Sequence, residues 1–166
     1  ADVVVNQTGY TNMLKSVSRP LGGKFELEYK RTGNTYDLPQ SRWVMSKVSV
    51  FDGAASDTPD LTAGSDYRAF KYDYQNGKHD RIEREFLGFA NVVQEELNTA
   101  GVNLIAGASN TEVFSDNVKS AINAASVFRV SNQTYRNDSF YSKGLLTDSE
   151  TKGRKNTDGT GPLVTY

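Results

Sequence analysis

Apolar and charged side chains alternate over several stretches of the chain, which predicts antiparallel β-strands. Phe25, Leu27 and Tyr29 alternate with charged residues, and this two-residue period is typical of a strand whose two faces meet different surroundings. Residues 19–23 precede this strand and contain one Pro and two Gly, which favour a tight turn. Together with a first strand over residues 13–18, they predict a β-hairpin.

Further strands are predicted from stretches rich in β-branched and aromatic residues. These stretches are residues 42–51, 67–74 and 126–146, and residues 162–166 are a candidate for a last strand. Asn76 and Gly77 follow the second stretch and form a dipeptide typical of hairpin turns. We therefore expect the chain to reverse there. The tail after Thr147 is polar and Gly-rich.

Residues 80–97 carry a competing pattern, because their apolar positions also fit a helix. These positions are Ile82, Phe86, Phe89, Val93 and Leu97, spaced by four, three, four and four. Asp80 is a candidate helix cap, with Glu83 three residues later. Against a helix, Gly88 lies inside the pattern and costs about 1 kcal/mol there, and the preceding Asn-Gly turn requires a returning strand. Periodicity alone therefore leaves helix and strand open.

Residues 100–126 differ in character, since they are rich in Ala, Gly, Asn and Ser with scattered aliphatic side chains. We interpret them as an insertion or a long connection. Ser115 or Asp116 is a candidate cap for a short helix over residues 117–125. The sequence thus predicts an all-β fold of antiparallel hairpins, a twisted sheet or strip, with at most one short helix near residues 116–125.

Composition narrows the class of protein. The 166 residues include 20 acidic and 19 basic side chains, a balance that gives no overall attraction to nucleic acid or anionic membranes. The chain has no Cys, which excludes disulfides and thiolate metal sites. No apolar run approaches the roughly 18 residues that span a bilayer. Because the chain opens without Met, we expect residues 1–166 to be a single β-rich segment of a larger protein.

The candidate chemistry centres on the single histidine. His79 is followed by Asp80, Glu83 and Glu85, but imidazole metal sites usually use two or more such ligands, and no nucleophile elbow accompanies it. We therefore expect the carboxylates to pair with neighbouring cations across strands. The tyrosines of residues 67–74 are either a stacking surface for sugars or bases, or filling for a core poor in aliphatic residues.

Three stretches, in order, resemble the shell region of SpvB/TcdB-type bacterial toxin proteins, the B components of insecticidal toxin complexes, which are relatives of the Rhs/YD-repeat family. The first is residues 14–53, with "PLGGKFELEY" and "PQSRWVMSKV". The second is "YDYQNGKHDRIEREFLGF", residues 72–89. The third, residues 134–152, contains "YRNDSFYSKGLL", where Arg136, Ser139 and Phe140 depart from the family pattern. The residues that carry the resemblance are Gly22, Gly23, Tyr29, Trp43, Asn76, Gly77, Arg84, Glu85, Phe86, Gly88, Phe89, Tyr141 and Gly144.

The resemblance implies a non-catalytic structural segment of a secreted or cell-surface bacterial toxin. In the family, hairpins form a strip that winds into a β-shell and encapsulates a toxic C-terminal domain. The resemblance also favours the strand over the helix in residues 80–97, with His79 as a turn residue. Gly88 is then either a bulge or a site of close packing between the buried rings of Phe86 and Phe89. We assign no catalytic, cofactor or metal residue.

The implied partners are the rest of the parent toxin chain and other toxin-complex subunits, with no nucleic acid and no membrane span. The alternative function is a glycan- or protein-binding β module at the bacterial surface, which would use the tyrosines of residues 67–74.

Overall fold

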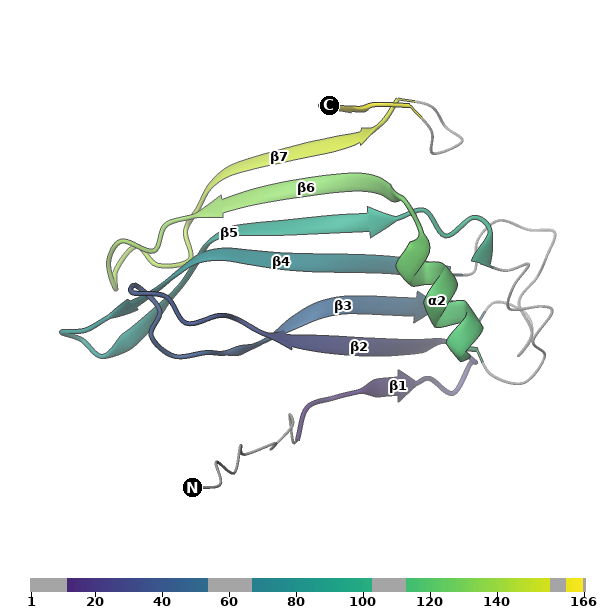
Figure 1. Cartoon of the computed structure of the whole chain (residues 1–166), viewed down its shortest axis with the longest axis horizontal. Helices are drawn as coiled ribbons and strands as arrows, with labels where there is room; N and C mark the ends of the chain where they lie inside the picture. Colours follow the sequence, from purple (N-terminus) through teal and green to yellow (C-terminus); the bar gives the residue numbers. More distant parts are fainter. Residues whose placement is uncertain (1–11, 54–66, 103–112, 156–160, 166) are drawn as a thin grey trace, which may run out of the picture.

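The computed structural model describes residues 12–53, 67–102, 113–155 and 161–165. They form one eight-stranded antiparallel sheet whose strands neighbour each other in chain order, with one short helix at one end of the strands (Figure 1). The elements are β1 Ser16–Ser18, β2 Lys24–Arg31, β3 Trp43–Phe51, β4 Tyr67–Asp80, β5 Glu85–Leu97, α2 Asp116–Ala124, β6 Val127–Tyr135, β7 Leu146–Arg154 and β8 Leu163–Thr165. The predicted all-β class is confirmed.

Several predicted elements form as expected. The β1–β2 hairpin closes where Arg19 N–H donates to the Gly23 carbonyl at 2.7 Å. The predicted strand at residues 42–51 is β3, and the candidate last strand is β8. Helix α2 begins after Ser115, whose hydroxyl accepts a hydrogen bond from Val118 N–H, as the predicted N-cap requires.

The predicted turn at Asn76 and Gly77 is wrong, because both residues lie inside β4. Asn76 lies inside the strand although its φ is 55°. Asn tolerates this left-handed conformation better than most residues. The chain reverses after Asp80 instead. Its carboxylate accepts hydrogen bonds from Ile82 N–H at 2.8 Å and Glu83 N–H at 3.1 Å, which fixes the turn.

The helical alternative for residues 80–97 is also wrong, since this stretch forms the β4–β5 turn and β5. Gly88 has a φ of 94° and lies at a register shift between β4 and β5, which confirms the predicted bulge. Phe86 and Phe89 are only half-buried, so their predicted burial is corrected. The buried residue of the bulge is Leu87, at 1% exposure.

Strand β7 has no counterpart in the predictions. Its sequence, LTDSETKGR, lacks the apolar alternation that marks a strand. It nevertheless pairs with β6 over nearly its full length, and the Ser131 and Thr151 hydroxyls lie 3.1 Å apart across the two strands. The backbone ladder and such cross-strand polar pairs hold this strand in the sheet.

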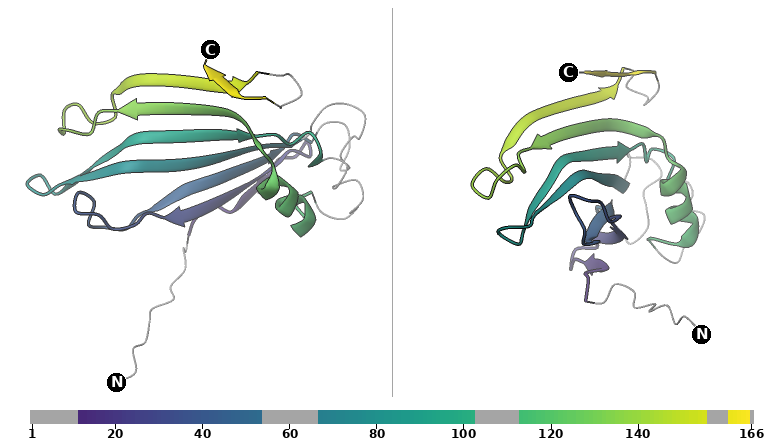
Figure 2. Two further views of the ribbon diagram at one scale, coloured as in Figure 1. Left: turned by 45° about the horizontal axis from the view of Figure 1, so that its top comes forward. Right: turned by 60° about the vertical axis from the view of Figure 1, so that its left-hand side comes forward.

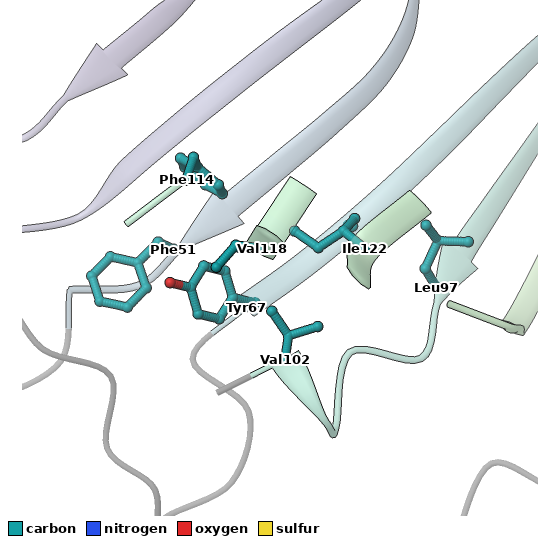
Figure 3. Packing of buried hydrophobic residues seen from close by; sticks show 8 residues of the cluster. Phe51, Tyr67, Leu97, Val102, Phe114, Val118 and Ile122 are labelled. Carbon is teal, nitrogen blue, oxygen red and sulfur yellow. The ribbon is translucent and has the colours of Figure 1, made fainter. Parts of the chain in front are cut away.

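The apolar core lies between α2 and the end of the sheet that the helix covers. Its buried members are Phe51, Tyr67, Ala69, Leu97, Val102, Phe114, Val118 and Ile122, most of which Figure 3 shows. The Tyr67 ring is fully buried. Its centroid lies 5.2 Å from that of Phe51 and 5.9 Å from that of Phe114. The core thus joins β3, β4 and β5 to the segment before α2 and to α2 itself.

The two faces of the sheet differ. Lys47 donates to Asn123 of α2 at 2.6 Å, and Lys119 of α2 donates to Glu26 at 2.8 Å, so charged residues of β2 and β3 lie on the face that carries α2. Figure 2 shows this helix on one side of the sheet. We call the opposite face the outer face. By strand alternation it carries half-buried apolar residues paired across strands, namely Phe25, Leu27, Val48, Val50 and Phe70. No described helix covers it.

The core under α2 yields a stability prediction. Replacing Ile122 by Ala leaves a cavity beside Tyr67, and we expect the free energy of unfolding to fall by about 2–5 kcal/mol. Urea denaturation followed by circular dichroism measures this change. The control is Ser120→Ala on the exposed side of the same helix, which should alter stability by no more than about 0.5 kcal/mol. Equal effects of the two substitutions would contradict this packing.

The bulge yields a second prediction, about backbone conformation alone. A Cβ at Gly88 would meet no atom within 4 Å, but the φ of Gly88 is positive. We therefore expect Gly88→Ala to destabilise the fold by about 1–2 kcal/mol. Gly33 also has open space around it and has no positive φ, so Gly33→Ala should be neutral or slightly stabilising in the same denaturation assay. A neutral Gly88→Ala would rule out the left-handed bulge.

Candidate functional site

The sheet splits between β3 and β4. These strands pair only where Lys47–Phe51 of β3 meets Tyr67–Lys71 of β4. Beyond that point, Trp43 to Met45 of β3 pair with β2, while the rest of β4 pairs with β5 among the described residues. A register shift after Glu28 marks the place where β2 and β3 diverge from β4. We call the opening the slot.

Two hollows occupy the slot. The larger, of about 700 Å³, lies between the end of β2, the loop after β2, and β4. The smaller, of about 490 Å³, reaches toward α2 and is lined by residues of β2, β3, β4, β5 and α2. Lys30, Asp73 and Gln75 line both, so the two hollows lie next to each other.

The loop between β2 and β3 closes the far end of the slot. Thr35 N–H donates to the Leu38 carbonyl at 3.0 Å, and His79 N–H of β4 donates to the Asp37 carbonyl at 2.7 Å. Leu38 is buried. A Cβ at Gly77 would lie 2.7 Å from the Leu38 Cδ2 and 2.8 Å from the Phe89 Cε1. Gly77 therefore has a packing role, since only Gly lets Leu38 and Phe89 approach β4 so closely.

Charged residues from separate strands face one another in the slot. Lys30 Nζ lies 2.6 Å from Asp73 Oδ1, and Gln75 Nε2 donates to Asp73 Oδ2 at 2.9 Å. The hydrogen bond from Lys30, and next that from Gln75, lower the pKa of Asp73. At the α2 end, Lys47 is 4% exposed and donates to Glu28 at 2.9 Å and to Asn123 at 2.6 Å.

The residues around His79 do not assemble into a catalytic or metal group. His79 lies in β4, not in a turn as expected, and its Nδ1 has no hydrogen-bond partner among the described residues. Asp80 is engaged by backbone N–H groups of the turn, and Glu85 pairs with Lys143. Within the described ranges, no three His, Asp or Glu side chains are grouped to hold a metal ion.

The structure joins the second and third motif stretches. Asn137 Nδ2 donates to the Asn76 carbonyl at 2.7 Å, and Lys143 pairs with Glu85. Gly144 N–H donates to the Arg136 carbonyl at 2.9 Å, with a φ of 80° at Gly144. Arg84 has a φ of 55° in the turn before β5, and Tyr141 is 94% exposed.

The first motif stretch lies on β1, β2 and β3. Gly22 and Gly23 pack against Gly53, where a Cβ would lie 2.2 Å from Gly23 N. The Tyr29 hydroxyl donates to the Leu14 carbonyl at 2.9 Å, and the Arg31 guanidinium lies 5.6 Å from the centroid of the Trp43 ring. These contacts hold hairpin ends and strand ends in place and involve no reactive group.

The tyrosines of residues 67–74 do not form one exposed surface. Tyr67 is fully buried under α2, whereas Tyr72 and Tyr74 are half-buried. Burial raises the pKa of both Tyr72 and Tyr74. The slot residues Lys30, Leu38 and Asp73 were not among the predicted site residues, because isolated charges on alternating strands give no motif in the sequence.

The chain belongs to the family described as the insecticide toxin TcdB middle/N-terminal region, whose family model matches residues 1–116. It is therefore a region of a TcdB-type toxin. No curated protein matches the chain. In the ranges that the structure describes, no helix is long and apolar enough to cross a membrane.

Solved structures with some likeness include the crystal structure of TcdB2-TccC3-Cdc42, at 17% identity and a TM-score of 0.42, covering 94% of this chain and 10% of that chain. The crystal structure of TcdB2-TccC3 gives 13% identity and a TM-score of 0.39, covering 87% of this chain and 10% of that chain. The chain thus spans about a tenth of the length of these solved chains.

Carboxylates with lowered pKa values give a pH prediction. The pKa of Asp80 is lowered, first by the hydrogen bond from Glu83 N–H and then by that from Ile82 N–H, and the pKa of Asp73 is lowered by Lys30. A folded pKa below the unfolded value of about 3.9 stabilises the fold above that pH, and the contribution is lost as the pH falls through the folded pKa. We expect urea midpoints to drop between pH 6 and pH 2.5.

Asp80→Asn keeps an acceptor oxygen but cannot ionise, so its midpoint should fall less over the same pH range. Ser120→Ala at an exposed position of α2 is the control, and it should keep the pH dependence of the unchanged chain. Identical pH profiles for Asp80→Asn and the unchanged chain would contradict the role of this carboxylate in the turn.

Proposed function

We propose that the chain is a non-catalytic wall segment of a secreted or cell-surface bacterial toxin, and that it contributes to a β-shell that encapsulates a toxic C-terminal domain. The observation that carries the proposal is a single-layer sheet with open edges, in a chain of the TcdB family. The partners of this segment are then the rest of the toxin chain and other subunits of the toxin complex.

Open edges support the proposal. The edge strand β1 pairs with Lys24, Phe25 and Glu26 of β2 only, so residues 28–31 have no outer strand in the part of the chain described. Likewise β8 pairs with Lys152, Gly153 and Arg154 of β7 only, and residues 146–151 lack a second described partner strand. Edges that lack a second described strand invite further strands, as a continuing wall would supply.

Uncovered apolar side chains support it as well. The outer face has no described layer on it, and Leu21, Ile82 and Tyr141 at the turns are 90%, 91% and 94% exposed. The apolar residues of the outer face are neighbours across strands, and a contiguous apolar surface marks contact with another surface. A segment embedded in a larger wall would cover these residues with neighbouring segments.

Protease protection in the complete toxin tests the proposal. We expect the C-terminal domain of the unchanged toxin to resist a protease that cleaves the same domain when it is released from the shell. Tyr67→Ala, which removes the ring between Phe51 and Phe114, should open the wall and make the C-terminal domain cleavable. Ser120→Ala should leave it protected, and circular dichroism should show that the rest of the toxin stays folded.

Mass spectrometry of the digests identifies the cleaved bonds. A C-terminal domain that is cut at the same rate in the unchanged toxin and in its released form would contradict encapsulation. A wall role for this segment would be contradicted if Tyr67→Ala destabilises the segment while the C-terminal domain stays fully protected.

A further inference from the structure

We propose that the slot between β3 and β4 binds an extended segment of polypeptide, supplied by another region of the same toxin, which adds as a strand to the open edge of β4. The family is described as a middle/N-terminal region, so the toxin has further polypeptide to supply. This inference rests on family membership and goes beyond the wall function, because it assigns a binding site inside the sheet.

Strand β4 has an open edge along the slot. From Tyr72 to Lys78, β4 pairs with β5 and with no other described strand. His79 N–H points into the slot, since it donates to the Asp37 carbonyl. Nearer α2, the Tyr67 carbonyl points to the β5 side, since it accepts from the Thr99 hydroxyl. Backbone groups of successive strand residues point to opposite sides, so Tyr72 and Tyr74 direct backbone groups away from β5 and into the slot. Such groups need partners, and an added strand supplies them.

The two hollows of the slot leave room for an added strand. The larger hollow holds about 700 Å³ and the smaller about 490 Å³, within the range of ordinary binding pockets. Because they share Lys30, Asp73 and Gln75, they follow β4 from α2 toward the loop after β2. The seven residues from Tyr72 to Lys78 correspond to about 23 Å of extended chain, which a segment of similar length would match.

The lining defines the chemistry of the segment. Cations and anions both face the larger hollow, among them Lys30, Lys78, Asp37 and Asp73, so a segment with little net charge fits best. Leu38 and Phe89 line the end near the loop. An apolar side chain at that end of the segment would pack against them, while polar side chains would face the charged part.

The Lys30–Asp73 ion pair spans the slot and can be broken when a strand binds. Its side chains are 43% and 49% exposed, and exposed ion pairs contribute little to stability. An incoming strand can therefore displace the pair at small cost. Arg136 and Asp138 form a comparable pair outside the slot, at 2.6 Å with side chains 51% and 55% exposed.

Binding of toxin-derived peptides to the 166-residue chain tests the proposal. The probe is a set of overlapping 12-residue peptides that covers the complete toxin sequence, read by fluorescence anisotropy. We expect a few weakly charged peptides to bind, and N-methylation of alternate backbone nitrogens on one edge to weaken binding at least tenfold. Hydrogen exchange should show slower exchange in residues 72–78 when a peptide is bound.

A double variant separates the slot from other sites. Lys30→Ala with Asp73→Ala removes the ion pair that spans the slot and should strengthen peptide binding several-fold. Arg136→Ala with Asp138→Ala should change peptide binding less than twofold. The proposal is overturned if no peptide binds, if N-methylation has no effect, or if protection appears at residues 28–31 or 146–151 instead. Binding of glycans from an array in the slot, without peptide binding, would overturn it too. None of these outcomes bears on the protease protection that tests the wall function.

Discussion

The packing of Tyr67 under α2 is the contact on which the rest of the structure depends. The ring is fully buried, it lies between Phe51 and Phe114, and its hydroxyl donates to the Val113 carbonyl at 2.7 Å. One side chain thus connects two neighbouring strands to the segment that leads into α2. Because most of the buried apolar residues gather here, the sheet is anchored at one end and has little apolar packing of its own at the other.

This one-ended core explains the split between β3 and β4. Near α2, the strands are held together by the core and pair in register. Farther away, they separate, and charged contacts such as Lys30 with Asp73 take the place of ladder hydrogen bonds. The loop after β2 then folds over β4 through Leu38 and Gly77. The slot is therefore a consequence of where the apolar residues lie, and its polar lining follows from the alternation of the strands.

Much of the fold could be predicted from the sequence, because alternation and turn residues act locally. The first hairpin, β3 and the capped helix follow from such local signals, whereas the bulge at Gly88 was expected only from the family resemblance. The turn at Asn76–Gly77 could not be judged correctly, since Asn and Gly tolerate positive φ both in turns and inside an irregular strand. The carboxylate of Asp80 decided the position of the turn. The sequence did not predict β7, because pairing with β6 stabilises this strand and its own residues show no apolar alternation.

The candidate site was less predictable than the fold. The slot depends on where strand pairing stops, and on residues of β2, β4 and a loop that lie far apart in the sequence. Conversely, the motif residues that were visible in the sequence hold turns and strand ends. The family match places the chain in a TcdB-type toxin, and the open edges of the sheet are the feature on which the proposed wall function rests.

Hydrogen exchange tests the central claim, that the sheet is completed by the rest of the toxin, most directly. The measurement compares the 166-residue chain with the same residues inside the complete toxin. The account predicts that those amides of residues 28–31 and 146–151 that point away from β3 and β6 exchange rapidly in the isolated chain and slowly in the toxin, while Tyr67 and Ile122 are protected in both. Equally rapid exchange of both edges in the complete toxin would contradict it.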